Sequence, residues 1–332
     1  MIQATSLTKR YRSRTVVRGV SFSCEPGTVT GFLGPNGAGK STTLKMLCGL
    51  AQPSSGSSTI LGVPFKQLPN PGRRIGVLID ASAQHSGRRG HEILATSAQL
   101  MGVSSARVDQ MLRLVGLDES AAHKRVGQYS LGMRQRLGIA HALLGDPEVL
   151  ILDEPANGLD PEGMRWMREL LTDFAARGGT VLLSSHLLHE VQATADRLVV
   201  IARGEIVAQG TPSELLGGAP RTIVRTADGS ISDRLLIRAM NVELSPGADG
   251  TLVTDAAPAD VGRAALSAGV ALAELRPATE GASLEQLFFQ LTSDAVDGSD
   301  PDGHGPGGHD PFEPNSATAE SPNSVSPQES LR

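Results

Sequence analysis

The stretch GPNGAGKS, at residues 34–41, has the residue types and spacing of a loop that binds phosphate. The apolar run Val29–Leu33 precedes it and a helical pattern follows it, which is the context that such a loop needs. Lys40 is expected to reach the β- and γ-phosphates of a nucleotide, and Ser41 is expected to ligate Mg²⁺. Three glycines allow backbone N–H groups to converge on the phosphate oxygens: Gly34, Gly37 and Gly39. A glycine-rich turn that only joins a strand to a helix is the alternative, which this context disfavours.

Two further runs place polar groups directly after apolar strands. VLILDEP, at 149–155, ends in two adjacent carboxylates, and such a buried strand end loses solvation energy unless a cation lies nearby. We expect Asp153 to face Mg²⁺ and Glu154 to lie near the attacking water as a general base, a role that contributes about 10²–10⁴ in rate. LLSSH, at 182–186, ends in His186, which at the carboxyl edge of a parallel sheet is expected to contact the γ-phosphate. Two exposed acids and an ordinary surface histidine are the alternatives.

A second candidate for anion binding is YSLGMRQR, at residues 129–136. Ser130 has the chemistry of a helix N-cap, two arginines follow it, and a long apolar-periodic segment comes next. The N-terminus of a helix presents unpaired N–H groups and the positive end of the helix dipole, and both favour an anion. The residues alone leave open whether this segment meets the phosphate of the loop at 34–41 or a different one.

The elements that must position these groups alternate between short apolar runs and helical periodicity over about residues 1–216. This alternation predicts an α/β domain with a mainly parallel sheet whose two faces are covered by helices. The clearest predicted strands are Val29–Leu33, Ile75–Ile79, Val149–Leu152, Val181–Ser184 and Leu198–Ile201. The predicted helices lie at about 39–50, 90–101, 105–116, 133–145, 161–177 and 187–195.

The rest of the chain divides into two parts by composition. Residues 217–292 are predicted to form a small α/β domain, with strands at Ile223–Arg225 and Ala271–Leu275. A helix with a capping box at Ser283 and an apolar face is expected near the end of this domain. Residues 293–332 are rich in Gly, Pro, Ser and Asp and have little to bury, so we expect them to be a disordered acidic tail.

Composition disfavours several classes of protein. The hydrophobic content of 39% and charged content of 20% are ordinary for a globular protein, and no apolar run approaches the roughly 18–20 residues that cross a bilayer. The N-terminal residues lack the apolar segment of a secretory signal. Cys24 and Cys48 form no spacing motif, which favours reduced, partly buried thiols over a disulfide or a metal pair. The tail carries a net charge of −7 out of a total of −5, so residues 1–292 carry about +2, and this near-neutral body gives no reason to expect nucleic acid as the main partner.

In their order and intervals, GPNGAGKS, YSLGMRQR, VLILDEPANGLDP and SSH make residues 2–216 resemble the ATP-binding subunit of an ATP-binding cassette (ABC) transporter. The resemblance implies a P-loop NTPase core with a helical subdomain at about 80–146, with ATP and Mg²⁺ as cofactors. It implies ATP hydrolysis in which Lys40, Glu154 and His186 take part. The implied nucleotide contacts are Tyr11, which would stack on adenine, and Gly34, Asn36, Gly37, Gly39, Lys40, Ser41, Thr42, Ser130, Gly132 and Asp160. The implied Mg²⁺ ligands are Ser41, Asp153 and Asp80.

The resemblance also gives the second anion-binding segment a role. YSLGMRQR matches the family's signature motif, which binds the γ-phosphate held by the phosphate loop of the partner subunit. Two copies of the chain are then implied to form a head-to-tail homodimer with two composite ATP sites. The stretch 157–160 matches the D-loop, which communicates between the subunits. A contact between the two segments within one chain is the alternative.

The chain departs from the family's pattern at two places. Leu131 and Met133 stand where the signature motif has a small residue and a glutamine, whereas the two residues that contact the γ-phosphate are retained. Asp80 stands where the family has a glutamine that senses Mg²⁺ and the membrane partner. A carboxylate can still ligate the ion or its water, and Gln84 is the alternative substitute. This departure leaves the coupling loop open but does not affect ATP binding.

The resulting hypothesis is an ATP-hydrolysing subunit on the cytoplasmic face of a bacterial membrane. It would power export of a drug, antibiotic or lipid-like molecule through a separately encoded multi-span permease, because the cassette with its small C-terminal domain resembles drug- and antibiotic-export ATPases. The segment 80–91, with Arg88 and Arg89, is the candidate docking surface, and a plain solvated face is the alternative. The alternative function is a non-transport ABC ATPase acting on nucleic acid or ribosomes, which the single cassette and the absence of heptads and of a basic stripe disfavour. A P-loop kinase would not need YSLGMRQR.

Overall fold

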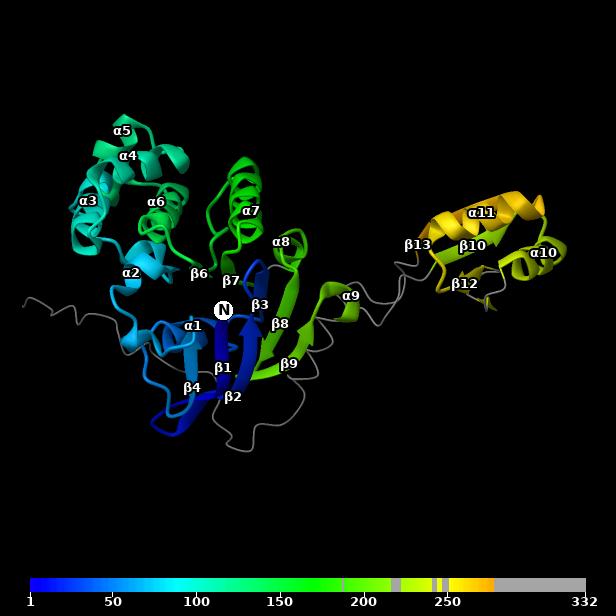
Figure 1. Ribbon diagram of the computed structural model, residues 1–332, viewed down its shortest axis with the longest axis horizontal. Helices are drawn as coiled ribbons and strands as arrows, with labels where there is room; N and C mark the ends of the chain where they lie inside the picture. Colours follow the sequence, from blue (N-terminus) through cyan, green and yellow to red (C-terminus); the bar gives the residue numbers. More distant parts are fainter. Residues whose placement is uncertain (187, 216–221, 241–243, 247–250, 278–332) are drawn as a thin grey trace, which may run out of the picture. The chain divides into compact units, whose positions relative to one another are not determined.

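The computed structural model describes residues 1–186, 188–215, 222–240, 244–246 and 251–277. Its central element is a six-stranded sheet in the order β5-β6-β7-β3-β8-β9 (Figure 1). All neighbouring pairs are parallel except β8 and β9, which are antiparallel. The strands are β3 (Val29–Leu33), β5 (Ile75–Leu78), β6 (Val149–Asp153), β7 (Thr180–Ser185), β8 (Arg197–Ala202) and β9 (Glu205–Gly210). The five strands predicted from the apolar runs are confirmed, with ends that shift by no more than one residue.

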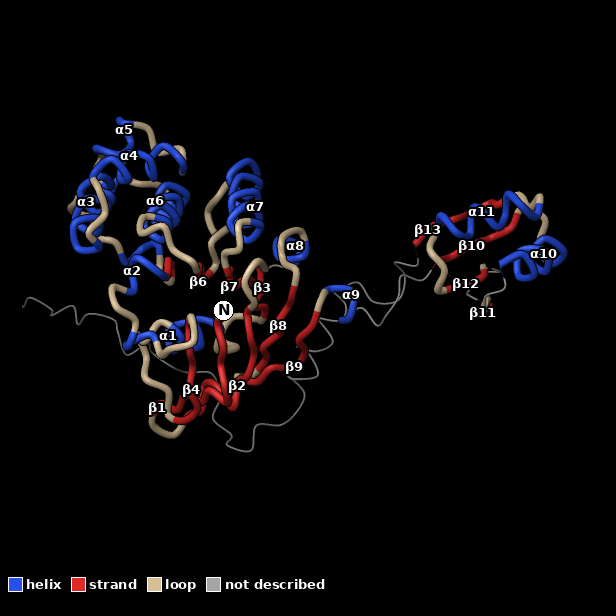
Figure 2. Tube along the Cα trace, viewed as in Figure 1, coloured by secondary structure: helices blue, strands red, loops and turns tan. Residues whose placement is uncertain are grey.

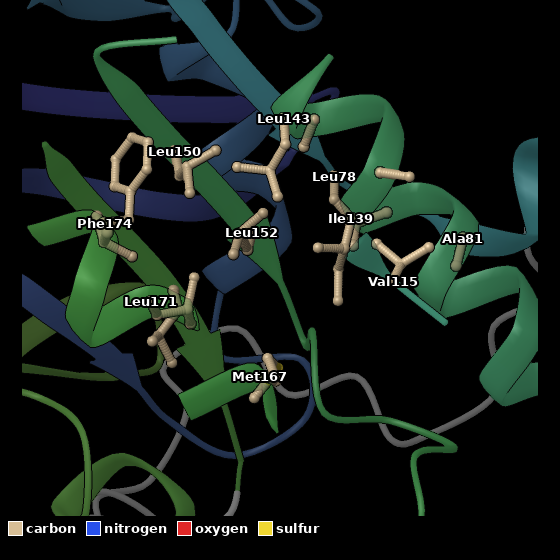
Figure 3. Close-up of a cluster of buried hydrophobic side chains, with 14 of the residues drawn as sticks. Leu78, Ala81, Val115, Ile139, Leu143, Leu150, Leu152, Met167, Leu171 and Phe174 are labelled. Atoms are coloured by element: carbon tan, nitrogen blue, oxygen red, sulfur yellow. The ribbon is translucent and has the colours of Figure 1, made fainter. Parts of the chain in front are cut away.

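The apolar runs form strands because both faces of this sheet are covered. Along β6, Leu150 and Leu152 belong to a core shared with α6 and α7, whereas Val149 and Ile151 pack on the opposite side. Figure 3 shows the first of these cores, where Ile139 of α6 and Leu171 of α7 approach the β6 leucines. A strand buried on both faces has no polar side to alternate, which explains why these runs are continuously apolar.

A second, three-stranded antiparallel sheet was not predicted. It has the order β2-β1-β4 and consists of β1 (Ile2–Tyr11), β2 (Arg14–Cys24) and β4 (Ser55–Ile60). Its strands are buried on one face only: in β1, Ile2, Ala4 and Leu7 are buried among mostly exposed Thr, Ser and Lys residues. Register shifts interrupt the pairing of β1 with both neighbours. A half-exposed strand with irregular register gives a weak signal in the sequence.

The helices form two groups around the main sheet. Figures 1 and 2 show α3, α4, α5 and α6 gathered together, and α6 packs on β5. The bounds in this group are α2 (Pro71–Arg74), α3 (Gly90–Met101), α4 (Ser105–Leu114), α5 (Glu119–His123) and α6 (Leu131–Leu143), with the 3-10 helices η2 (Ala81–Ala83) and η3 (Val126–Gln128). The others are α1 (Lys40–Leu47), η1 (Phe65–Gln67), α7 (Pro161–Ala176), α8 (Leu188–Gln192) and α9 (Pro212–Leu215). The six predicted helices form, but α6 begins two residues earlier than predicted because Ser130 caps it.

A third sheet has four strands in the order β11-β12-β10-β13. Its elements are β10 (Thr222–Thr226), α10 (Ser230–Met240), β11 (Ser245–Pro246), β12 (Leu252–Thr254), α11 (Pro258–Ala268) and β13 (Leu272–Pro277). This is the split βαβ arrangement of ferredoxin-like folds, with a small core around Val224, Leu236 and Val261. The two predicted strands are confirmed as β10 and β13, whereas α10 and α11 were not predicted. The predicted helix after Ser283 and the tail lie outside the described residues, so the domain boundaries stay predictions.

Two smaller expectations can be compared with the structure. Cys24 and Cys48 are free and buried, as predicted, and burial raises the pKa of each thiol to about 12. Within the described ranges, none of the helices has the length and apolar character required to span a bilayer.

Candidate functional site

The loop between β3 and α1 closes around the Lys40 side chain. Lys40 is the first residue of α1 and only 6% exposed, and its Nζ donates to the carbonyl oxygens of Gly34 at 2.7 Å and Pro35 at 3.4 Å. Gly39, the N-cap, has a φ of 106°, which side chains rarely tolerate, and a Cβ on Gly34 would lie 2.3 Å from the carbonyl oxygen of Ile201. The backbone conformation at Gly39 and the close packing at Gly34 therefore both require glycine. The outer part of the loop, residues 35–37, is exposed.

Three of the predicted catalytic side chains meet at the carboxyl edge of the sheet. Nζ of Lys40 lies 3.3 Å from Oε1 of Glu154, and Nδ1 of His186 lies 2.8 Å from its Oε2. The Glu154 side chain is 20% exposed, and each of its oxygens therefore has a basic partner. This cluster joins the ends of β6 and β7 to the start of α1. In this arrangement the lysine and the histidine can each turn to a phosphate, and the carboxylate is then free to accept a hydrogen bond from a water.

Asp153, the other carboxylate of VLILDEP, is buried and has its own partner. Oγ of Ser184, on β7, donates to Oδ1 of Asp153. The same hydroxyl oxygen accepts the backbone N–H of Glu154 at 3.0 Å. One serine thus orients the Asp153 carboxylate and the Glu154 backbone together. Sequence reasoning did not select Ser184; its signal was a hydroxyl residue directly after the apolar run Val181–Leu183.

The residues at this edge fit a nucleotide with a divalent cation. The Ser41 hydroxyl belongs to an exposed side chain in the first turn of α1, and the carboxylate of Asp153 ends the strand β6. Hydroxyl, carboxylate and phosphate oxygens form the donor set that Mg²⁺ prefers. Over the described part of the chain, no group of three or more His, Cys, Asp or Glu side chains forms a metal site.

Asn36, Thr42 and Tyr11, the other expected nucleotide contacts, differ in their exposure. Asn36 lies in the exposed part of the loop, and Thr42 is half-buried in α1. Tyr11 ends β1 and is 50% exposed, and Nζ of Lys9 lies 4.7 Å from its ring centroid. The exposed aromatic ring can stack on a base. The assignment of Tyr11 to adenine stays a prediction.

Asp80 acts as a cap in this structure. Its Oδ1 accepts the backbone N–H of Ser82 at 2.8 Å and the hydroxyl of Ser82 at 2.5 Å, at the start of η2. These hydrogen bonds, chiefly that of the Ser82 hydroxyl, lower the pKa of Asp80 below its ordinary value and keep it ionised. The residue is exposed. Its proposed role as a Mg²⁺ ligand stays a prediction.

The N-terminus of α6 forms a second cluster, with the loop before α7. Ser130 caps α6 as predicted: its Oγ accepts the N–H of Met133 at 3.2 Å. Gly132 faces the backbone of Gly158, since a Cβ on Gly132 would lie 2.6 Å from that carbonyl oxygen, and the Leu131 side chain occupies the space where a Cβ of Gly158 would lie. Within the described residues, no hydrogen bond or ion pair joins Ser130 to the phosphate loop.

Arg136, one of the two arginines counted with the second anion-binding segment, contacts groups of α7 and of the residue Val115 within the chain. It lies 3.9 Å from Oδ1 of Asp160, which caps α7 by accepting the N–H of Gly163 at 2.9 Å. Its guanidinium lies 5.0 Å from the ring centroid of Trp166 and donates to the carbonyl oxygen of Val115 at 2.8 Å. Asp160, expected to contact nucleotide, is in this structure a helix cap and the partner of Arg136.

A comparison with protein families and with known proteins gives a consistent result. The model of the family described as "ABC transporter" matches residues 17–157. The bacitracin transport ATP-binding protein BcrA of Bacillus licheniformis is 42% identical over 212 residues, which are 63% of this chain and 69% of that protein. The Nod factor export ATP-binding protein I of Burkholderia lata is 36% identical over 301 residues, which are 88% of this chain and 96% of that protein.

Solved structures agree with the fold. One titled "Structure of ATP binding subunit of ABC transporter" has a TM-score of 0.60 and 29% identity, and the match covers 65% of this chain and 91% of that one. The dimeric structure of MJ0796, a bacterial ABC transporter cassette, has a TM-score of 0.59 over 64% of this chain and 98% of that one; at 22% identity it supports the fold alone.

Proposed function

This chain belongs to the family of ATP-binding subunits of ABC transporters, and from that premise we propose that it powers export through a separate membrane permease. The ATPases of this family hydrolyse ATP, and the observation that carries the proposal is the contact of Glu154 with both Lys40 and His186 beside the phosphate loop. Its relatives named for bacitracin transport and Nod factor export support the export direction. The chemical class of the cargo is then a drug, antibiotic or lipid-like molecule.

In the proposed reaction, bound ATP replaces the internal partners of Lys40. Its triphosphate would take the Lys40 ammonium from Glu154 and the loop carbonyls, because a charge-assisted contact with phosphate is stronger than one with a neutral carbonyl. Glu154 would then accept a proton from the attacking water, and His186 would contact the γ-phosphate. Mg²⁺, held by Ser41 and Asp153 with Asp80 close to the ion or its water, would neutralise charge on the phosphates. Tyr11, Asn36 and Thr42 would complete the contacts to the nucleotide.

The active form is proposed to be a homodimer with two nucleotides sandwiched between the copies. Ser130 and Gly132 of one copy would contact the γ-phosphate held by the other copy, and the loop with Asp160 would report across the interface. The exposed position of Ser130 and its separation from any contact with Lys40 support this arrangement. Hydrolysis removes the γ-phosphate and with it the contact that holds the dimer closed.

The membrane partner is proposed to be a multi-span permease, with this chain bound at the cytoplasmic face. The candidate docking surface is the segment 80–91, which has a fixed shape. The Arg88 carbonyl oxygen accepts the N–H of Val126, and the Arg89 N–H donates to the carboxylate of Glu92. Both arginines are exposed.

Light scattering of the Glu154→Gln variant with ATP and Mg²⁺ tests the sandwich. The variant should bind ATP without hydrolysing it and should accumulate as a dimer, whereas Lys40→Ala with the same additions should stay monomeric. A Glu154→Gln variant that stays monomeric with saturating ATP and Mg²⁺, also with its permease present, would overturn the proposal. Export is tested by sequencing the neighbouring genes for a multi-span protein and expressing that protein with this chain in a drug-sensitive host, with Lys40→Ala as the inactive control.

A further inference from the structure

The backbone of Glu154 adopts a conformation that glutamate rarely takes. Its φ is 48°, in the left-handed region, directly after the last residue of β6. A residue that is not glycine is strained in such a conformation and keeps it only when its surroundings hold it there. The direction in which the Glu154 carboxylate leaves the sheet therefore depends on the groups that hold its backbone.

Two side chains from different elements hold this backbone. The N–H of Glu154 donates to Oγ of Ser184 at 3.0 Å, and its carbonyl oxygen accepts Nε2 of Gln135 at 3.1 Å. The same carbonyl oxygen also accepts the N–H of Asn157 at 3.2 Å, which closes the turn. Both polar groups of the strained peptide are thus bound by side chains that lie far from it in the sequence.

Gln135 is buried, and its position on α6 gives this contact a further consequence. The residue is 3% exposed on a helix whose other buried side chains are apolar, so its amide needs partners in the interior. It stands five residues after Ser130, on the same rigid helix. Any displacement of the α6 N-terminus therefore moves the amide that holds the Glu154 carbonyl.

We propose that Gln135 is a positioning residue that fixes the Glu154 carboxylate for water activation and couples it to the N-terminus of α6. The inference rests on the proposed function, since it takes Glu154 as the base and the α6 N-terminus as the contact to the second nucleotide. Binding of a γ-phosphate at Ser130 then tightens α6 and, through Gln135, sets the base that serves the other nucleotide. Hydrolysis at each site consequently depends on occupancy of the other.

Gln135→Met and Gln135→Glu test this role in the full-length chain. Methionine keeps the length of the side chain and removes the donor, and glutamate replaces the Nε2 donor with an oxygen. Since a displacement of about 1 Å can cost about 10²-fold, we expect kcat for MgATP to fall by about 10–100-fold in both variants while KM stays within a few-fold. His141→Leu is the matched control, because it removes a partly buried hydrogen bond of α6, to Oγ of Ser97 at 2.8 Å, that does not involve Glu154. It should lower the melting temperature and leave kcat within a few-fold.

The decisive measurement is the double variant Gln135→Met with Glu154→Gln. If Gln135 acts through Glu154, the double variant has the residual turnover of Glu154→Gln alone, because effects of residues that act as a unit do not add. An unchanged kcat in folded Gln135→Met or Gln135→Glu would overturn the inference, as would a further fall in the double variant. A Glu154→Gln variant with wild-type turnover would instead overturn the assignment of Glu154 as the base. The failure of the inference about Gln135 and the failure of the proposed function would therefore appear in different variants.

Discussion

The phosphate-loop cluster and the N-terminus of α6 differ in how far their polar groups are satisfied within the chain. Lys40 and Glu154 are largely buried, and each has charged or carbonyl partners at hydrogen-bond or ion-pair distance. Ser130 is exposed and accepts one N–H from its own helix, and no hydrogen bond among the described residues uses the N–H groups of Leu131 or Gly132. In the proposed function the first cluster would bind a nucleotide by exchanging partners, whereas the second presents backbone N–H groups at an exposed helix end.

This difference explains how one chain can have two anion-binding devices without redundancy. In the phosphate-loop cluster, Lys40 and Glu154 compensate each other's charge, and in the proposed reaction a triphosphate takes the lysine from the glutamate. A helix N-terminus that presents open N–H groups gains most from an anion brought to it from outside. The proposed head-to-tail homodimer would pair the two devices, the phosphate loop of one copy with the α6 N-terminus of the other.

The largest expected effect comes from Glu154→Gln, which removes the carboxylate from the phosphate-loop cluster and keeps the size and shape of the side chain. Glutamine cannot accept the proton of the attacking water, so kcat should fall by about 10²–10⁴-fold. The affinity for MgATP should be retained, because the amide no longer competes as an anion for the Lys40 ammonium. Phosphate release and binding of a fluorescent ATP analogue measure the two quantities, and turnover at the wild-type rate would remove Glu154 as the base.

Lys40→Ala is expected to have the next largest effect, on binding. A hydrogen bond to a charged group contributes about 1.5–3 kcal/mol, which corresponds to a rise of about 10–100-fold in the Kd for ATP. The variant also leaves Glu154 with His186 as its one remaining basic partner in the cluster. Calorimetric titration with ATP measures the change, Lys45→Ala on the same helix is the control, and an unchanged Kd would contradict the assignment of the phosphate loop.

The chemistry of the phosphate-loop cluster could be predicted from the sequence, because each of its residues lies in a short motif directly beside a predicted strand. GPNGAGKS follows its strand directly, and Asp153 and His186 end strands whose apolar runs are unmistakable. Parallel strands bring their carboxyl ends to one edge, so the meeting of these groups follows from the pattern alone.

Gln135 and Ser184 could not be found in this way. Each works by contacting a residue in a different element, and neither stands in a spacing that local chemistry requires. The sheet of β1, β2 and β4 was missed for a related physical reason, because its strands bury one face only and shift register. Partners that meet only through tertiary packing leave little trace in the periodicity of a single sequence.

Mixing two inactive variants tests directly whether the phosphate loop of one copy works together with the α6 N-terminus of the other copy. In a sandwich of two copies, a dimer of one Lys40→Ala subunit and one Ser130→Ala subunit has one site in which both the loop and the helix tip are intact. Turnover should therefore reappear on mixing, although each variant alone has little. No recovery, with mixed dimers demonstrated by differently tagged subunits, would indicate that Ser130 and Lys40 act within one chain.

Gly158→Ala should have a smaller effect, and it changes only the cluster formed by the N-terminus of α6 and the loop before α7. Gly158 has a φ of 78°, and a Cβ there would lie 2.5 Å from Cγ of Leu131, so the loop before α7 must shift away from the α6 tip. We expect a loss of about 1–3 kcal/mol in stability and a several-fold lower kcat, both partly restored by adding Leu131→Ala. Gly178→Ala is the matched control, because its φ is 90° and its Cβ would contact nothing within 4 Å. Equal effects of the two glycine substitutions would mean that backbone strain, and not the contact with Leu131, is responsible.

Removing residues 293–332 should have the smallest effect. The segment carries eight acidic residues and one arginine, and its composition predicts that it contributes no packed contact to either cluster. The kcat, the Kd for ATP and the melting temperature of the truncated chain should therefore match those of the full chain. The acidic tail can affect the N-terminus of α6 in one way. As a polyanion, it can compete with phosphate for the backbone N–H groups there. A rise in kcat on truncation that disappears in high salt would reveal this competition, because screening weakens contacts between exposed charges and leaves the buried pair of Lys40 and Glu154 largely unaffected.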